Sequence, residues 1–414
     1  MKKKLLLLVS LLLTACLLGS CAYLPIEGLT SLSSGTSGQT PVSEDGDTVT
    51  ISREQYERYQ QFDELLELID ITDTYFYQDI NLEDMLHGAA SGLLSGLGDP
   101  YTYYYTPEEY AEMWEEDEGE YGGIGIQISS SYLTGISTVS RVFENSPASE
   151  MGVQRGDILY RVGEDLYVTA YNIEEAVDIM RGVPGTTVDI TFLRNGEMLT
   201  NTFTRAQVNV NRVEAGMLTD AIGYIYLYEF AGDCATQFTE KLNGLLKQGA
   251  KGLIIDLRDN PGGWVNDAQT IADLFVDQGI LCYLEYKDGS RQYYRTTNGK
   301  TELPLVILVN EYSASSSEIL AGCLKDRADA TIVGVQSYGK GIVQSVIPVG
   351  SDGAAMQVTI AQYFTPNGNA VHGIGVTPDV EIALPEGDNG MYEFGSLDDV
   401  QLAEALRVMQ EKMK

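Results

Sequence analysis

The chain has 414 residues, 44% of them hydrophobic and 21% charged, which is typical of a folded protein with more than one domain. Its formal net charge of -34 argues against nucleic acid as a partner, because phosphate binding relies on clustered lysine and arginine. An acidic surface of this kind favours solubility and says little about the fold.

Residues 1–26 have the pattern of an export or anchoring segment, in which three lysines precede a long uncharged apolar stretch. Two tetrapeptides, ending at Cys16 and Cys21, resemble the processing box of bacterial lipoproteins, whose cysteine becomes the lipidated N-terminus. We expect lipidation at Cys21, which leaves the longer apolar region; an uncleaved span of roughly 20 residues is the alternative. Either way the protein is tethered on the extracytoplasmic side of a bacterial cell membrane, through a flexible linker at residues 27–50.

Residues 51–118 are predicted to be mainly helical, because leucine, isoleucine and methionine recur there at helical spacing. A new helix is expected to begin at Pro107, with Thr106 as its N-cap and Glu109 completing a capping box. Its acidic residues surround apolar ones such as Trp114, so they indicate a solvated helix face and not a metal site.

Residues 119–207 have glycine turns and short β-like runs. The glycines of GGIGI can expose successive backbone N–H groups, which form a nest for a carboxylate. The edge from Ile124 to Ile128 can pair with an extended peptide as an added strand. Together with SPASEMGVQRGDILYRVGED and NIEEAVDIMRG, this segment resembles a PDZ domain. The candidate peptide-binding residues are Gly122, Gly123, Ile124, Gly125 and Ile126.

Predicted strands and helices alternate from Val213 onward, which favours a layered α/β domain at residues 208–386. The segment 387–414 contains a predicted terminal helix with Leu402, Leu406 and Met409 on one face. The terminal helices could support a dimer or could pack on their own core.

The internal cysteines, Cys234, Cys282 and Cys323, are odd in number, far apart and surrounded by apolar residues. The sequence has no CxxC pair and no cysteine and histidine spacing of a metal site. We therefore expect buried free thiols, no metal and no cofactor, and a cysteine protease is disfavoured.

The segment EYSASSSE, residues 311–318, crowds four serines between an apolar run and a helix-like run. One interpretation is structural: Ser315 is a helix N-cap and Glu318 completes its capping box. A hydroxyl at such a junction is also well placed as a nucleophile, because free N–H groups and the helix dipole can stabilise an oxyanion. Both interpretations can hold together, and the segment alone does not decide between them.

A serine nucleophile needs a base. The two histidines, His87 and His372, have no obvious serine and aspartate partners, although spacing alone does not exclude His372. Lysine can replace histidine if its amine is neutral, and burial favours the neutral form. Lys340 is flanked by Gly339 and Gly341, which let backbone pack close to it. A lysine base predicts activity that rises toward alkaline pH.

The same stretch matches half of a phosphate-loop pattern, since Gly334, Gly339 and Lys340 have the required spacing. Gly341 stands where that loop needs serine or threonine, and a strand-like run follows where it needs a helix. Nucleotide binding is therefore disfavoured.

Three stretches, LIIDLRDNPGGW, VNEYSASSSEILAG and SYGKGIVQ, follow the PDZ-like segment in this order. Together they resemble the carboxyl-terminal processing proteases, family S41 serine peptidases with a catalytic Ser-Lys pair, and the likeness runs from about Asp63 to about Glu386. The resemblance implies a multidomain α/β fold, with a ClpP/crotonase-like α/β protease core, an inserted PDZ β-barrel domain and an N-terminal helical segment.

The resemblance assigns Ser315 as nucleophile, Lys340 as general base and Gln344 as the residue that orients the lysine. It also implies an oxyanion hole from backbone N–H groups of Gly262 or Gly263 and of Ser316. The family usually has alanine where Ser316 stands and glycine where Tyr312 stands, so Ser316 and Ser317 stay as lesser candidates for the nucleophile.

We therefore predict a membrane-tethered extracytoplasmic serine endopeptidase that cleaves protein substrates near their C-termini, which the PDZ domain recognises. Gating of the enzyme by the PDZ domain is a further hypothesis, motivated by the position of this domain between the helical segment and the protease core. The partners are protein or peptide substrates, and a homodimer stays open. One alternative is a catalytically inactive PDZ scaffold that binds protein C-termini, but intact Ser315, Lys340 and Gln344 argue against it. An acyl-group enzyme on the crotonase-like fold would lack both the PDZ insertion and the export signal.

Overall fold

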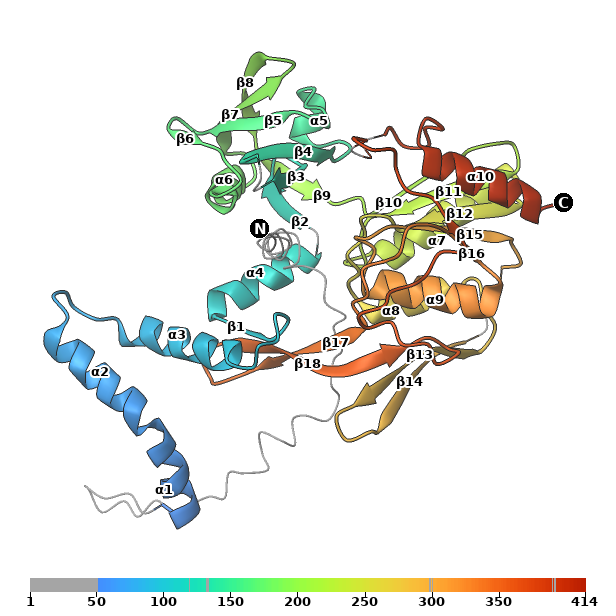
Figure 1. Cartoon of the computed structure of the whole chain (residues 1–414). Coiled ribbons are helices and arrows are strands. Elements are labelled where there is room, and N and C mark those ends of the chain that lie inside the picture. Colours follow the sequence, from blue (N-terminus) through green and yellow to red (C-terminus); the bar gives the residue numbers. More distant parts are fainter. Residues whose placement is uncertain are drawn as a thin grey trace, which may run out of the picture. The chain divides into compact units, whose positions relative to one another are not determined.

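The computed structural model describes residues 51–118, 120–131, 134–297, 299, 301–388, 390 and 392–414 (Figure 1). The predicted export segment with Cys21, and the predicted linker, lie outside these residues. None of the helices in this described part combines the length and the apolar character that crossing a membrane requires. The chain divides into two compact units: a smaller one with the described residues up to Glu108 and Ser345–Thr359, and a larger one with Glu109–Gln344 and Ile360–Lys414.

The smaller unit is mainly helical. Ser52 and Asn81 are N-caps whose side chains accept backbone N–H groups of the first helical turns. No residue of its three α-helices is buried, and side chains such as Leu66 and Leu93 are exposed. Its elements are α1 (Arg53–Tyr59), η2 (Gln60–Phe62), α2 (Asp63–Tyr75), α3 (Leu82–Ser95) and β1 (Tyr103–Tyr105), which pairs with the first residues of β18 (Ala355–Phe364).

Helix α4 (Pro107–Glu118) begins at the predicted proline and leads into strand β2, which pairs with β9 in a two-stranded sheet. The next sheet, called the first sheet of the larger unit, has the order β3-β4-β5-β7-β8, with β6 paired to β5, and its core contains Val139, Phe192 and Phe203. Strand β3 stands at the end of this order, so one of its edges has no neighbour in the sheet. The elements are β2 (Glu120–Gly123), β3 (Ile126–Ser131), β4 (Ile136–Val142), α5 (Pro147–Glu150), β5 (Ile158–Val162), β6 (Leu166–Tyr167), α6 (Ile173–Met180), β7 (Thr187–Arg194), β8 (Glu197–Thr204) and β9 (Ala206–Asn209).

The second sheet of the larger unit has the order β10-β11-β12-β15-β16-β19. All neighbours from β11 to β19 pair in parallel, and β10 pairs antiparallel to β11. The predicted mixed α/β fold is therefore confirmed. The elements of this part of the chain are β10 (Val213–Met217), β11 (Ile222–Leu227), α7 (Cys234–Gln248), β12 (Gly252–Asp256), α8 (Val265–Asp273), β13 (Gly279–Tyr286), β14 (Arg291–Thr296), β15 (Leu305–Val309), α9 (Ser316–Ala328), β16 (Thr331–Gly334), β17 (Ile342–Pro348), β19 (Val380–Glu381) and α10 (Val400–Lys412). Strands β13, β14 and β17 lie outside this sheet: β13 pairs antiparallel with β14 and β18, and β17 pairs with β18.

Helix α10 packs on the parallel sheet of its own chain (Figure 1). Its residues Leu402, Leu406 and Met409, predicted to share one face, are buried against Ile254 and Leu308. The apolar face of this terminal helix is therefore used within the chain.

Candidate active site

Three neighbouring parallel strands carry the three stretches that resemble protease motifs. β12 pairs with β15, and β15 pairs with β16, so the carboxyl ends of these strands lie at one edge of the sheet. The Asn-Pro-Gly-Gly turn follows β12, the serine-rich segment follows β15, and the loop with Lys340 follows β16. Open α/β sheets place their binding residues at such an edge. The topology thus brings together stretches that are far apart in the sequence.

Ser315 is the N-cap of helix α9 and has an unusual backbone conformation. Its φ is 54° and its ψ is -116°, and a residue with a side chain adopts a positive φ rarely and at a cost in energy. The residue is fully buried, and its Oγ has no hydrogen-bond partner among the described residues. Because a buried hydroxyl normally has a partner, this one calls for a functional explanation.

The hydroxyls of the other three serines in the segment all have partners. Each donates a hydrogen bond to a backbone carbonyl between β12 and α8: Ser313 to Leu257 at 2.7 Å, Ser316 to Gly263 at 2.7 Å and Ser317 to Asn260 at 2.9 Å. These three hydroxyls hold the turn against the start of α9. Ser315 alone among the four keeps its hydroxyl outside this network.

The turn after β12 is shaped by Asn260 and by two glycines. Asn260 donates through Nδ2 to the carbonyl of Leu227 at 2.8 Å, and its Oδ1 accepts the N–H of Gly262 at 2.9 Å. Gly262 has a φ of 104°, and a Cβ there would lie 2.7 Å from the Cβ of Ser315. Only glycine therefore fits beside the nucleophile candidate. Because the Gly262 N–H already has an acceptor, Gly263 is the better oxyanion-hole candidate of the two.

Glu318 joins the start of α9 to the loop with Lys340. Its Oε2 accepts the backbone N–H of Ser315 at 3.0 Å and that of Lys340 at 2.9 Å. Its Oε1 accepts the N–H of Gly339 at 2.7 Å and the hydroxyl of Ser337 at 2.5 Å. The backbones of the candidate nucleophile and the candidate base thus meet at a single oxygen atom.

The carboxyl of Glu318 is almost completely buried. Burial raises its pKa above the ordinary range, while the hydrogen bonds from Ser337, Gly339, Ser315 and Lys340 oppose that rise. The sequence predicted only the capping role of this residue. A glutamate in the first turn of a helix, directly before the apolar run 319–324, is the signal that could have suggested more, because buried carboxylates need several donors.

Lys340 is 2% exposed, and such burial is rare for a lysine. Its neighbour Gly341 packs so closely on the backbone of His372 that a Cβ would lie 2.1 Å from the His372 nitrogen. Gly339 has a φ of 86°. Gln344 follows on β17 and is fully buried. The two glycines therefore allow close packing around the lysine.

The two histidines lie in different surroundings. His372 is exposed, and its backbone packs on Gly341. His87 lies on α3 in the smaller unit, where its Nδ1 is 2.8 Å from the hydroxyl of Tyr104. Among the residues that the structure describes, neither histidine is joined to a serine and a carboxylate in a catalytic arrangement.

A buried ion-pair network anchors the strand that precedes the Asn-Pro-Gly-Gly turn. Arg258 contacts Asp256 at the end of β12 at 2.6 Å and Asp399 at 2.7 Å, and it donates to Gln401. Asp399 is the N-cap of α10 and accepts two backbone N–H groups of its first turn. The start of the terminal helix is thereby tied to the backbone beside the turn.

Cys234, Cys282 and Cys323 are buried free thiols, as predicted, and burial raises the pKa of each. Within the described ranges no group of histidine, cysteine, aspartate or glutamate side chains could hold a metal ion.

The five predicted peptide-binding residues do not all lie along one open edge of the sheet. Gly122 and Gly123 belong to β2 and pair with Gln207 and Ala206 of β9, so they are not part of an open glycine loop. Ile124 is buried in the core of the first sheet, and Gly125, with a φ of 83°, packs against Ser146. Ile126 begins the end strand β3. The edge that can accept an added strand therefore starts at Ile126 and not at Ile124.

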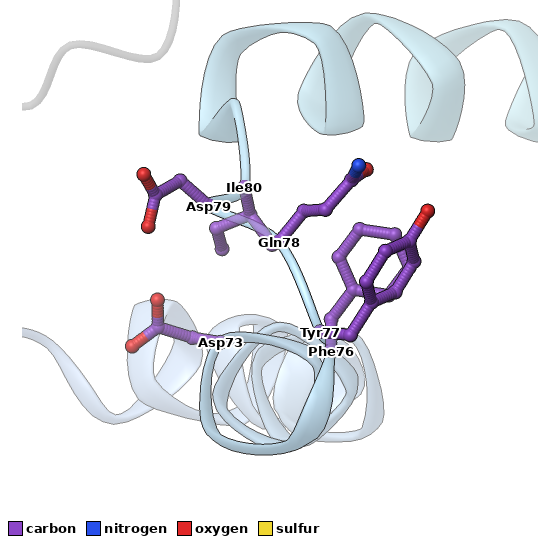
Figure 2. A pocket seen from close by; sticks show the side chains of 6 residues that line it. All are labelled: Asp73, Phe76, Tyr77, Gln78, Asp79 and Ile80. Atoms are coloured by element: carbon purple, nitrogen blue, oxygen red, sulfur yellow. The ribbon is translucent and has the colours of Figure 1, made fainter.

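A surface hollow of about 800 Å³ lies in the smaller unit, where α2 passes into α3 (Figure 2). Figure 2 shows the carboxylates of Asp73 and Asp79 on one side of this connection and the rings of Phe76 and Tyr77 on the other. Gln78 and Ile80 complete the lining. None of the predicted site residues lines this hollow.

Comparisons with known proteins agree with the motif resemblance. Peptidase family S41 matches residues 221–382. The carboxyl-terminal-processing protease of Picosynechococcus sp. is 33% identical over 347 residues, which cover 82% of this chain and 83% of that protein. The carboxy-terminal processing protease CtpA of Bacillus subtilis is 32% identical over 314 residues, which cover 75% of this chain and 66% of the relative. The solved structure of the photosystem II D1 C-terminal processing protease has 27% identity and a TM-score of 0.53, and the match covers 84% of this chain and 97% of that one.

Proposed function

Since the chain belongs to peptidase family S41, the carboxyl-terminal processing proteases, and is a serine-type peptidase, we propose that it cuts protein chains near their C-termini with a Ser315 and Lys340 pair. The observation that carries this proposal is the contrast among the serines. Three hydroxyls donate to the neighbouring turn, and the hydroxyl of Ser315 has no partner among the described residues. Glu318 holds the backbones of both residues of the pair.

In the proposed mechanism, the Oγ of Ser315 attacks the carbonyl carbon of the scissile peptide bond while its proton passes to the Nζ of Lys340. The oxyanion accepts hydrogen bonds from the backbone N–H groups of Gly263 and Ser316. The C–N bond then breaks, and the leaving amine takes the proton from Lys340. Water, activated by the same amine, hydrolyses the acyl-enzyme and restores the hydroxyl. Gln344 orients the lysine side chain.

We assign the sheet formed by β3 to β8, together with α5 and α6, as an inserted PDZ domain. Two features support this assignment: β3 is an end strand, and Ile126 and Ile128 of β3 pack on the same core cluster as Val177 of α6. A substrate C-terminus would add a strand along β3 and place its last apolar side chain toward α6. Peptides that end in a free carboxylate are therefore the expected ligands.

We propose tethering by lipidation at Cys21 or by a spanning segment, on the extracytoplasmic side. The basic and apolar pattern of the first 26 residues supports this proposal. The exposed apolar side chains of α2 and α3, such as Leu66 and Leu93, support a homodimer through the N-terminal helices. Metabolic labelling with a radioactive lipid precursor, compared between wild type and Cys21→Ser, tests the anchor.

Cleavage of an unstructured protein by wild type, Ser315→Ala and Lys340→Ala tests the catalytic pair. We expect each substitution to lower kcat by about 10⁴-fold or more, since the two residues act as a unit. The control is Lys247→Ala, an exposed lysine of α7, which is expected to cleave at the wild-type rate. Retained cleavage by a folded Ser315 or Lys340 variant would overturn the assignment.

Covalent labelling identifies the nucleophile independently. A fluorophosphonate probe, which reacts with activated serines, is expected to modify wild type at Ser315, as located by peptide mapping. Ser316→Ala is expected to be labelled as well, because the hydroxyl that it lacks only supports the turn. Label on Ser316 or Ser317 of the wild-type protein would contradict the proposal.

A further inference from the structure

The two tryptophans of the chain stack on each other. Trp114 lies on α4 and Trp264 directly follows Gly263, and their ring centroids are 5.8 Å apart with an interplanar angle of 18°. Both residues belong to the larger unit. Trp114 remains 39% exposed, so the stack lies at the surface and not in the core.

Trp264 is connected to the candidate active site through the turn that precedes it. Its backbone N–H donates to the carbonyl of Phe230 at 2.7 Å, and it is the N-cap of α8. The carbonyl of the preceding residue, Gly263, accepts the hydroxyl of Ser316, and Gly262 contacts Ser315. Gly262 and Gly263 pack closely on Ser315 and Ser316, so a displacement of Trp264 also displaces the proposed oxyanion turn.

Trp114 is connected to the proposed PDZ domain through β2, which follows α4. The carbonyl of Gly122 in β2 accepts the N–H of Gly182, just beyond the end of α6, at 2.9 Å. A Cβ at Gly122 would lie 2.1 Å from the carbonyl oxygen of Gly182. The end of α6 and strand β2 are therefore packed without a gap, and a movement of one displaces the other.

We propose that Trp114 is a positioning residue that couples the groove between β3 and α6 to the oxyanion turn. A peptide C-terminus in the groove shifts α6 and β2, the shift changes the stack on Trp264, and the turn beside Ser315 moves with it. Stacking of two aromatic rings changes the equilibrium between the stacked and the unstacked arrangement by only about 2- to 10-fold. The binding of a peptide can therefore shift Trp114 and Trp264 from one arrangement to the other. The inference rests on the proposed function, since it concerns the regulation of that same site.

The stack has a direct spectroscopic signature, because the chain has no other tryptophan. Two stacked indoles give an exciton couplet in circular dichroism, and their fluorescence depends on the stacking. We expect Ser315→Ala protein, which cannot turn over peptide, to change its couplet when an unstructured peptide with an apolar, free C-terminus is added. The same peptide with an amidated C-terminus is expected to leave the couplet unchanged. An unchanged couplet at peptide saturation, verified by calorimetry, would overturn the inference; so would an absence of binding.

Steady-state kinetics provide a second test of the coupling. With a short substrate that cannot reach the groove, we expect the free C-terminal peptide to change the kcat of wild type by about 2- to 10-fold when added in trans. Trp114→Ala is expected to lose this dependence with the KM for the short substrate unchanged, and Trp114→Phe to recover it. Glu112→Ala, an exposed residue of the same helix, is the matched control.

The two possible failures are distinguishable. If wild type cleaves, Ser315→Ala does not, and Trp114→Ala responds to the peptide as wild type does, the coupling is wrong and the proposed protease function stands. If wild type does not cleave, the proposed function fails, and the couplet still tests whether groove and stack are coupled.

Discussion

Ser315 and Lys340 donate their backbone N–H groups to the same oxygen atom of Glu318, at 3.0 and 2.9 Å. This carboxylate fixes the helix start that carries the proposed nucleophile and the loop that carries the proposed base. Misplacement of reacting groups by about 1 Å can cost about 100-fold in rate, so the geometry held by Glu318 is expected to matter for chemistry more than for substrate binding.

A Glu318→Gln substitution is expected to lower kcat by about 100-fold and to change KM by less than about twofold. The amide keeps one acceptor oxygen but turns an NH₂ group toward backbone N–H donors, so one side of the network is lost. Steady-state kinetics with a peptide substrate measure both constants. The matched control is Glu240→Gln, an exposed glutamate of α7. A normal kcat in a folded Glu318 variant would show that the carboxylate has no positioning role.

The same carboxyl predicts a dependence of stability on pH. Burial raises its pKa above the ordinary value of 4.5, so the folded protein holds this proton more tightly than the unfolded chain does. The stabilisation by this group is complete below about pH 4.5 and is lost as the pH rises through the folded-state pKa. Urea unfolding of wild type and Glu318→Gln between pH 4 and 7 is expected to show the free energy of unfolding of wild type falling relative to the variant. If the free energy of unfolding of wild type instead rose relative to that of Glu318→Gln as the pH increased, the direction of the pKa shift would be contradicted.

Gly262→Ala is expected to lower kcat by at least about 100-fold, because the new Cβ meets the Cβ of Ser315 at 2.7 Å and must displace the turn or the nucleophile. Gly289→Ala is the control that separates the effect of this clash from the effect of backbone strain. Gly289 also has a positive φ, of 79°, but nothing lies within 4 Å of the added Cβ. We expect a cost in stability at both positions and a loss of activity only at Gly262. Equal activity of the two variants would mean that the contact with Ser315 is unimportant.

Arg258→Ala is expected to lower the free energy of unfolding by about 3 to 5 kcal/mol, since Asp256 and Asp399 would remain buried without their cation. Arg407→Ala on the exposed side of α10 is expected to cost much less, although Arg407 also contacts two glutamates, because solvent screens exposed ion pairs. Chemical unfolding of both variants measures the difference. Similar costs would show that the buried network does not anchor α10.

Several features of the fold and of the site could be predicted from residue patterns. Alternating apolar strands and amphipathic helices predicted the α/β layers, because strand and helix periods differ and each element must bury one face. The order of the three motifs from Asn260 to Gln344 predicted the family, and Pro107 marked the start of α4. These signals are local, so they can be seen without knowing which segments meet.

The tertiary structure decided which serine keeps an unbonded hydroxyl, since the partners of Ser313, Ser316 and Ser317 are backbone carbonyls more than fifty positions away. It also decided that Glu318 reaches the Lys340 loop, that β2 pairs its glycines with β9, and that α10 covers its own sheet. Each of these depends on the order in which parallel strands lie side by side. Residue types and spacing determined the chemistry that the chain can offer, but strand order alone determined which of those groups meet, because hydrogen bonds and packing act only over a few ångströms.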